Sequence, residues 1–252
     1  PLHGVVGALE GAIAAMRERV TRGGLVHLPV AALQVVETPA ALRPIAAPLA
    51  YRAPADAGGD GVLLVTPPEP DGRRGGLARA ELASVAAREG VPGVHVQLAT
   101  ARALPHPVRR ALITAEGSAA WAAYAEWVMA ESGALGSSEE RFFHAYRVLR
   151  SAVRLLLDIV MHTKGVSVAA AADRLESELG LSPAEALAEA RRCCANPTLG
   201  VCEAVGRRAL LALREDVRRE RGPAFSLGVF HDELLRYGAL PTALARWGMG
   251  VA

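Results

Sequence analysis

The sequence predicts an α+β fold that is predominantly α-helical, with a small β-sheet in its N-terminal part. Two patterns indicate this fold. Apolar residues recur at spacings of three and four over most of the chain, as they do on one face of an α-helix. Between residues 25 and 66 this spacing gives way to prolines and two short runs of strand-forming residues. We therefore expect a single domain over 1–252, with a sheet region at 25–66 and a helical region at 77–252.

The chain should begin with a helix that ends near Gly23, because glycine at such a position stops helices. The apolar residues of this helix are Val5, Leu9, Ile13, Met16 and Val20. In the sheet region that follows, prolines exclude long helices. They are Pro29, Pro39, Pro44, Pro48 and Pro54. Short strands are predicted at 33–37 and 62–65, and a loop at 67–76.

Helices are predicted for most of the remaining chain. The first, at 77–89, should be broken at Pro92 and Gly93 before a second helix runs over 94–104, because proline inside a helix removes a backbone hydrogen bond. Ser137 and Glu140 fit a capping box, which predicts the start of the longest helix, at 138–164. Further helices are expected at 118–132, 183–196, 198–221 and 226–236.

The overall composition excludes several classes of protein. With 252 residues and 51% hydrophobic content, the chain can bury a sizeable core. Its 28 Lys and Arg nearly balance its 26 Asp and Glu, and a net charge of +2 predicts neither nucleic acid nor a membrane surface as a partner. No apolar run approaches the roughly 18 residues of a membrane-spanning helix, and we expect no secretion signal.

Cysteine usage bears on the compartment. The three cysteines, Cys193, Cys194 and Cys202, cannot form an even set of disulfides. No histidine stands beside them at the spacing of a zinc site. A reducing compartment is the simpler interpretation, and we expect the protein to be cytoplasmic.

One short stretch resembles a metal-binding motif. Residues 88–97 read REGVPGVHVQ. This stretch resembles the motif HExxPGHH, followed by a hydrophobic residue and glutamine, of the bacterial domain of unknown function 885 family, which is placed in the thermolysin-like metallopeptidase superfamily. Glu89 and His95 match the motif, whereas Arg88 and Val94 stand where it has histidines.

The resemblance continues downstream, over about 8–244. The family's EGWALYAE, whose first glutamate looks like a third metal ligand, reads AAWAAYAE at 119–126, so Ala119 stands in place of that glutamate. Its SYxxG reads CEAVG, which places Glu203 where the family has tyrosine. The stretches at 150–165 and 225–241 are similar to its RAARLVVDTGLHTKG and FSLxxFHDxLLxxGALP. Family members are generally about twice as long as this chain, with a helical N-terminal half.

This resemblance implies a zincin-like domain that has lost its zinc site. A catalytic zinc ion needs three protein ligands, and their places are taken here by Arg88, Val94 and Ala119. We therefore expect no bound metal, no other cofactor and no metal-dependent peptidase activity. The guanidinium of Arg88 would bring a fixed positive charge to the place of the metal, without its Lewis acidity.

The cleft implied by the resemblance supplies candidate acid–base residues. Glu89 keeps the position of a general base, and imidazole groups near it could exchange protons. The candidate histidines are His95, His162 and His231. A plainer interpretation stands beside each one. Glu89 can simply pair with Arg88, and each histidine can be a packed, hydrogen-bonded residue.

Basic residues of the same cleft are candidates for binding a carboxylate. They are Arg88, Arg150, Arg154 and Lys164, with Glu203 beside them. The alternative for Arg88 is a structural ion pair with Glu89 or Glu203.

Two functions fit these residues. The first is a non-peptidase protein that binds a small molecule or a partner chain in the old cleft. The alternative is a metal-free enzyme that performs acid–base chemistry on a small carboxylate or carbonyl compound, of the kind found in specialised metabolism, with Glu89 and nearby histidines. Because family members are longer, the first helix and the helix at 138–164 should expose apolar surface, which favours a homo- or hetero-oligomer.

Overall fold

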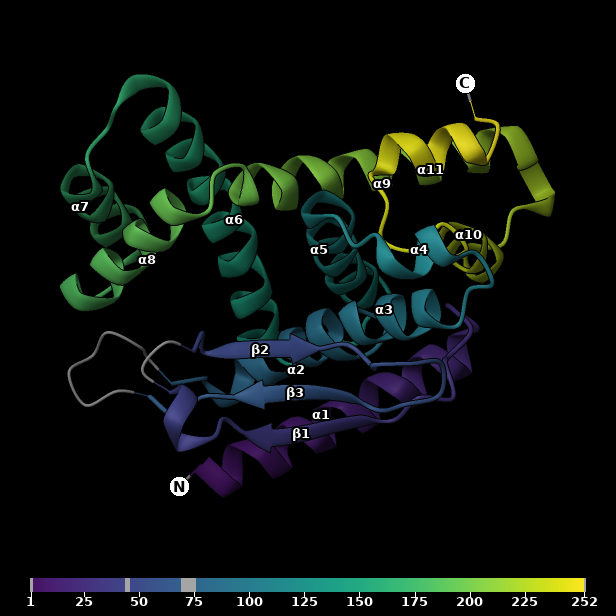
Figure 1. The fold of residues 1–252 in the computed structure, drawn as a ribbon, viewed down its shortest axis with the longest axis horizontal. Coiled ribbons are helices and arrows are strands. Elements are labelled where there is room, and N and C mark those ends of the chain that lie inside the picture. Colours follow the sequence, from purple (N-terminus) through teal and green to yellow (C-terminus); the bar gives the residue numbers. More distant parts are fainter. Residues whose placement is uncertain (1, 44–45, 69–75, 252) are drawn as a thin grey trace.

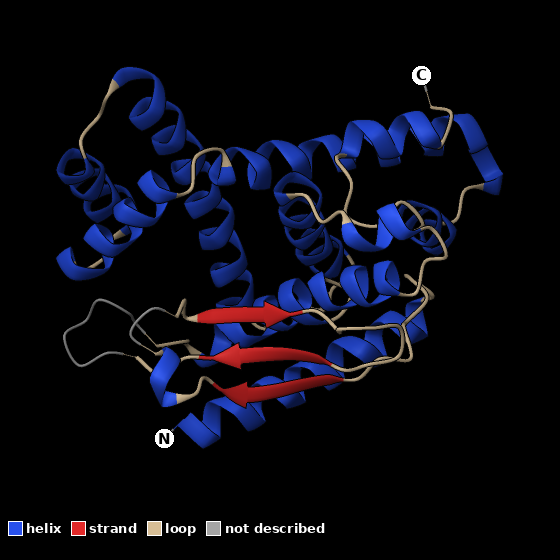
Figure 2. Ribbon diagram, in the orientation of Figure 1, coloured by secondary structure: helices blue, strands red, loops and turns tan. Residues whose placement is uncertain are grey.

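The structure is a computed structural model that describes residues 2–43, 46–68 and 76–251. A three-stranded sheet lies along one side of the molecule, and helices make up the rest (Figures 1 and 2). The predominantly helical α+β fold that the sequence predicts is confirmed. The predicted loop at 67–76 falls largely on 69–75, outside the described residues.

The sheet has the strand order β1-β3-β2, from β1 (Leu33–Glu37), β2 (Leu49–Arg52) and β3 (Gly61–Val65). The central strand, β3, runs parallel to β1 and antiparallel to β2. Both predicted strands are confirmed, as β1 and β3. The sequence does not predict β2, because its four residues lie in the proline-rich region and are too few to show an alternating pattern.

The first helix, α1 (Leu2–Gly23), ends where its glycines predict and packs against β1 and the segment after the sheet. Its buried apolar residues are Leu9, Ile13, Met16 and Val20. They share one core with Val35 of β1. Burial of each such side chain contributes about 1.5–3 kcal/mol, so this face of α1 is a principal support of the sheet.

The segment predicted as one helix at 77–89 is three short elements instead. They are the 3-10 turn η2 (Arg79–Glu81), α2 (Leu82–Val85) and the single π-helical turn η3 (Ala86–Gly90). The prediction of a continuous helix was therefore wrong in detail, although Leu82 and Val85 point inward as expected. π-helical turns are rare in proteins, and those that do occur are often found at functional sites. Here the turn carries Arg88 and Glu89.

The predicted break in this segment is confirmed, and α3 (Val94–Arg102) begins after it. The indole Nε1 of Trp121 donates to the carbonyl oxygens of Pro92 and Gly93, both at 3.0 Å. A Cβ atom on Gly93 would lie 1.8 Å from the carbonyl oxygen of Arg88, so only glycine fits. These contacts fix the direction in which η3 presents its side chains.

The remaining helices build the body of the protein. They are α4 (Pro107–Ala111), α5 (Ala115–Glu131), α6 (Ser138–Lys164), α7 (Val168–Leu179), α8 (Pro183–Ala195), α9 (Leu199–Arg221), α10 (Leu227–Leu235) and α11 (Thr242–Gly248), with 3-10 turns η1 (Ala40–Leu42) and η4 (Gly222–Ala224). In the described part of the chain, no helix is both long and apolar enough to cross a membrane.

Two packing features of these helices position the site. The central helix α5 lies along α9, and Gly206 allows their close approach, since a Cβ there would be 2.5 Å from the Cβ of Ala120. The hairpin of α7 and α8 packs on the C-terminal half of α6, with an apolar core of its own that includes Leu157 and Leu175. The capping box of Ser137 and Glu140 that opens α6 is confirmed.

One face of α6 exposes apolar side chains in a regular row, which we call the α6 stripe. Its members follow one another at alternating spacings of three and four and are all exposed: Phe142, Ala145, Leu149, Ala152, Leu156 and Ile159. This is the spacing with which one helix packs along another. The expectation of exposed apolar surface therefore holds for α6, whereas α1 turns its apolar face into the core.

We expect the isolated chain to self-associate through the α6 stripe, because contiguous apolar surface of this kind is rarely left in water. Light scattering should give a mass above 26.4 kDa at micromolar concentration. Leu149→Lys with Leu156→Lys should lower that mass, while Lys at the exposed Val30 of the sheet region should not. A monodisperse monomer that binds no apolar dye would contradict this expectation.

Candidate binding cavity

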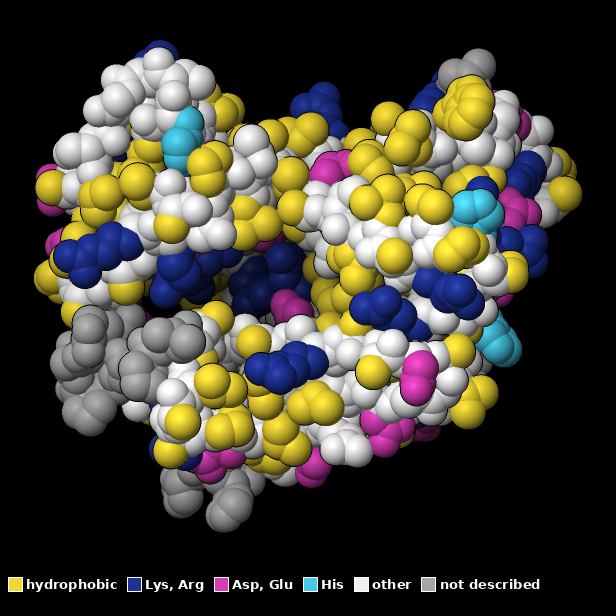
Figure 3. Space-filling model, in the orientation of Figure 1, with side chains coloured by type: hydrophobic (Ala, Val, Ile, Leu, Met, Phe, Trp, Pro, Cys, Tyr) yellow, Lys and Arg dark blue, Asp and Glu magenta, His cyan; other side chains and the backbone are white. Residues whose placement is uncertain are grey.

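A cavity of about 420 Å³ opens between β2, the segment η2–η3 and the helices α6, α8 and α9. Figure 3 shows it as a hollow in which side chains of Lys or Arg gather. The arginines that line it are Arg88, Arg147, Arg150, Arg154 and Arg192. The acidic residues are Glu81, Glu89, Asp158, Glu189 and Glu203. Leu49, Leu77 and Leu199 add an apolar part to the wall.

Arg88 enters the cavity from the π-helical turn and meets three carboxylates. Its Nη2 lies 3.1 Å from Glu203, its Nε 3.4 Å from Glu89 and its Nη1 3.9 Å from Glu126. Only 13% of its side chain is exposed. Burial alone would lower the pKa of Arg88, but the charges of Glu203, Glu89 and Glu126 outweigh burial and raise it. The side chain is a fixed cation braced by carboxylates.

Glu189 of α8 is the centre of a second cluster. Its buried carboxylate contacts Arg150 of α6 at 3.0 Å and also pairs with Arg154 and Arg192. Burial favours the neutral acid, but the three guanidinium groups hold the pKa of Glu189 far below its usual range. Glu189 is therefore ionised at neutral pH, and it ties α8 to α6.

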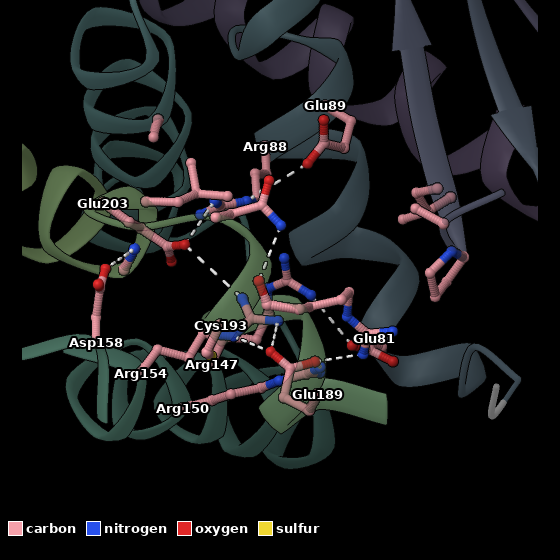
Figure 4. Close-up of a pocket in the computed structure, with 18 of the residues that line it drawn as sticks. Glu81, Arg88, Glu89, Arg147, Arg150, Arg154, Asp158, Glu189, Cys193 and Glu203 are labelled. Atoms are coloured by element: carbon pink, nitrogen blue, oxygen red, sulfur yellow. Dashed lines mark hydrogen bonds and ion pairs between the residues drawn. The ribbon is translucent and has the colours of Figure 1, made fainter. Parts of the chain in front are cut away.

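A third set of contacts joins the two clusters to the core. Glu126 of α5 is buried and lies 3.0 Å from His144 Nδ1 and 3.4 Å from Arg147 Nε. Arg147 also reaches Glu81 of η2 at 3.1 Å. Arg154, in turn, lies 3.9 Å from Glu203. The ion pairs thus form one continuous network around the cavity (Figure 4).

Asp158 supports the cavity from α6 by holding the start of α9. Its carboxylate accepts hydrogen bonds from the backbone N–H groups of Thr198 and Gly200, both at 3.0 Å. A carboxylate at a helix N-terminus satisfies free N–H groups and interacts favourably with the helix dipole. Asp158 is therefore a structural group, and it places Glu203 one turn further along α9.

Five of the residues predicted for the site do line the cavity. They are Arg88, Glu89, Arg150, Arg154 and Glu203. Lys164 does not line it: it is the last residue of α6, exposed and beyond the end of the cavity. The roles assigned to these residues stay predictions.

The three predicted histidines do not line the cavity, and this part of the expectation is corrected. His95 is buried beside the sheet, where its Nε2–H donates to the carbonyl of Ala31 and its Nδ1 accepts from Tyr51, at 3.1 and 3.0 Å. The break before α3 turns His95 toward the strands, away from Glu89. Burial lowers the pKa of His95, so it is a neutral packed residue.

His231 and His162 have structural partners as well. His231 is buried in the core, where its Nδ1–H donates to the carbonyl of Leu25 at 2.6 Å and its Nε2 accepts from Tyr124 at 2.8 Å. His162 lies at the protein surface, 2.9 Å from Asp158. A cluster of Glu89 with imidazole groups is therefore not formed.

Sequence reasoning missed Arg147, Arg192 and Glu189. A signal existed for Arg147, because it shares one face of α6 with Arg150 and Arg154 at helical spacing. No local signal marked Glu189 and Arg192, which read as an ordinary exposed pair on α8 until the hairpin folds onto α6.

The cavity does not fit a divalent metal ion. Arg88 places a guanidinium among the carboxylates, and each of Glu89, Glu189 and Glu203 already has an arginine partner. Of the three positions at which the sequence resemblance implied metal ligands, Arg88 and Ala119 line the cavity, but Val94 is packed in an apolar cluster with Leu98. Zinc requires neutral imidazole, thiolate or carboxylate ligands that converge on one point.

Nearly the whole chain matches one protein family. Residues 3–249 match the family described as "Bacterial protein of unknown function (DUF885)". The chain belongs to this family. Its members are bacterial, and the family description assigns no activity. A comparison with curated proteins gave no match.

Solved structures share the fold. A candidate lipoprotein from Colwellia psychrerythraea superposes with a TM-score of 0.88 at 23% identity, over 98% of this chain and 42% of that protein. A candidate lipoprotein of unknown function from Shewanella oneidensis gives a TM-score of 0.79 at 24% identity, over 97% of this chain and 45% of that protein. This DUF885 chain thus spans less than half the length of these two relatives.

His231 should make the stability of the fold depend on pH. Burial lowers its pKa to about 4, whereas in the unfolded chain it is about 6.5. Below pH 6.5 the unfolded chain binds a proton that the folded chain refuses, so stability is lost as the pH falls toward 4, by about 3 kcal/mol in all. We expect the wild type to lose its advantage in free energy of unfolding over His231→Gln as the pH falls from 6.5 to 4, as measured by urea unfolding. An advantage that stays constant over this pH range would contradict the assignment.

Arg88→Ala should destabilise the protein by about 1–3 kcal/mol, because it removes the ion pair of Glu89 and leaves Glu203 with the more distant Arg154, at 3.9 Å, in a largely buried place. Arg219→Ala is a matched control, since Arg219 pairs with Asp216 but is 78% exposed. That control should lose less than about 0.5 kcal/mol. Equal losses in urea unfolding would show that Arg88 is not a brace.

Proposed function

We propose that the protein binds a small molecule through a carboxylate group in the cavity, and that it is a zincin-like relative of metallopeptidases without their zinc chemistry. One observation carries the proposal: Arg150, Arg154 and Arg192 converge on the single carboxylate of Glu189 at the wall of the cavity. Arginine is the residue best suited to carboxylates, because its planar group can donate two parallel hydrogen bonds.

These three arginines keep capacity for a ligand. Each guanidinium has five N–H donors, so the three groups together have far more donors than the carboxylate of Glu189 can accept. Their side chains are 28%, 28% and 43% exposed, so a molecule in the cavity can reach them. The volume of about 420 Å³ is within the range of small-molecule sites. Leu49, Leu77 and Leu199 could contact an apolar part of such a ligand.

The loss of zinc is supported by the residues at the aligned positions. Arg88 occupies the cavity with a fixed charge, and Val94 and Ala119 offer no donor atom. The protein purified without chelator should therefore contain far less than one zinc ion per chain. Elemental analysis that finds about one zinc per chain would overturn this part of the proposal.

The enzyme alternative has less support. It needs an acid–base group beside Glu89, and His95, His162 and His231 lie elsewhere. Only Glu89 remains of that set. The cavity rather than the α6 stripe is proposed for the small molecule, while the stripe is the proposed contact for another polypeptide.

A cytoplasmic location remains part of the proposal. It rests on the three cysteines, which are free thiols. The description of two solved relatives as lipoproteins argues the other way.

Binding of a carboxylate can be measured by calorimetry with heptanoate and its uncharged amide. We expect heptanoate to bind and the amide to bind at least about tenfold more weakly, because hydrogen bonds between charged groups contribute roughly 1.5–3 kcal/mol. Arg150→Met should weaken heptanoate binding by a similar factor. Arg174→Met is the control, since Arg174 pairs with Glu178 on the surface of α7. Equal affinities for heptanoate and the amide would refute the proposal.

A further inference from the structure

The charges of the cavity wall are unevenly distributed. At one end lie the guanidinium groups of Arg150, Arg154 and Arg192 and the carboxylate of Glu189. Two further lining carboxylates lie near this end (Figure 4), but Glu81 is paired with Arg147 and Asp158 is held by backbone N–H groups of α9.

At the other end, one guanidinium group contacts three carboxylates. These are Arg88 with Glu89, Glu203 and Glu126, of which Glu126 does not itself line the cavity and is also paired with Arg147. His144 also contacts Glu126, and Arg207 lies close enough to Glu126 and Glu203 to offset part of their charge, which leaves Glu89 as the carboxylate with the least compensation.

The two ends are separated in space. Figure 4 shows Arg88 and Glu89 at one end of the cavity and Arg150 and Glu189 at the other. They come from different elements, since Glu89 belongs to η3 and Glu189 to α8. Arg154 lies between them, in contact with Glu189 and 3.9 Å from Glu203. The cavity therefore has a positive end and a negative end.

Glu89 is the carboxylate of the negative end with the most capacity for a ligand. Its one ion pair within the described residues is with the Nε of Arg88, at 3.4 Å. Its side chain is 22% exposed, against 15% for Glu203 and 5% for Glu126. A carboxylate oxygen accepts more than one hydrogen bond, so Glu89 can receive a donor from the cavity.

We propose that the ligand is a zwitterion, with its carboxylate held by Arg150, Arg154 and Arg192 and a protonated amine held by Glu89. The inference rests on the proposed function, which supplies the carboxylate. A second positive group on the ligand complements the negative end, where a ligand without one would leave Glu89 less well solvated than in the empty cavity. The class is that of amino acids whose two charges are separated by a short apolar chain, which Leu49, Leu77 and Leu199 can contact.

The test is a series of ω-amino acids, from 3-aminopropanoate to 8-aminooctanoate, each compared by calorimetry with the monocarboxylate of equal size. At one chain length the amine should raise affinity about fivefold or more over its partner, for example 6-aminohexanoate over heptanoate. The chain length that binds best then measures the distance between the two ends of the cavity. The whole panel uses the wild-type chain.

Glu89→Gln assigns the amine contact. The variant should bind 6-aminohexanoate no more than about twofold better than heptanoate, with heptanoate affinity preserved. Glu178→Gln, on the exposed surface of α7, should leave the preference for the amine unchanged. Melting curves of both variants show whether they are folded before binding is measured, and Glu89→Asp provides a second variant that keeps the charge but shortens its reach.

The outcomes separate the two proposals. If neither the amino acids nor the monocarboxylates bind, the proposed function itself fails. If heptanoate and its relatives bind as well as the amino acids at every chain length, the carboxylate site stands and the zwitterion is refuted. If the preference for the amine survives in Glu89→Gln, the assignment of the amine to Glu89 is refuted.

Discussion

Charge neutralisation inside the cavity wall is the constraint on which the arrangement of the helices depends. Removing an ionised carboxylate or guanidinium from water costs several kcal/mol unless an opposite charge replaces the lost hydration. Arg88, Glu126 and Glu203 come from η3, α5 and α9, and the burial of Arg88 depends on the two carboxylates. Glu189 of α8 depends in the same way on Arg150 of α6. The network therefore specifies one relative placement of these elements, a demand that apolar packing alone makes less strictly.

The π-helical turn η3 is the backbone feature that brings Arg88 into the ion-pair network. Arg88 and Glu89 are adjacent in sequence, and both line the cavity. The turn ends at the break, where Trp121 holds the carbonyl groups of Pro92 and Gly93. Because α3 restarts in a new direction, His95 faces the sheet although it follows Glu89 closely. One local distortion thus assigns neighbouring polar residues to opposite sides of the segment.

Local signals predicted much of the fold, and their range explains what they missed. The capping box at Ser137 acts within one helical turn, so it located the start of α6. β2 has only four residues and is defined by pairing with β3, which is not local information. For the site, motif resemblance placed Arg88 and Glu203, but it could not show that His231 would be enclosed by Tyr124 and Leu25. Glu189 acquires its partners only when α8 folds onto α6.

The separate apolar core under α7 and α8 has a consequence for motion. Leu157, Leu175 and Leu179 belong to a cluster distinct from the main core, so the hairpin can open as a cooperative unit of its own. Such an opening breaks the ion pairs of Glu189 with Arg150 and Arg154 of α6, but it leaves the packing of α5 against α9 intact. Its free energy includes the exposure of this apolar cluster and the loss of the two ion pairs, and backbone amides of α8 would exchange hydrogen with solvent before those of α5. Because α8 forms one wall of the cavity, the same opening would widen access to the cavity.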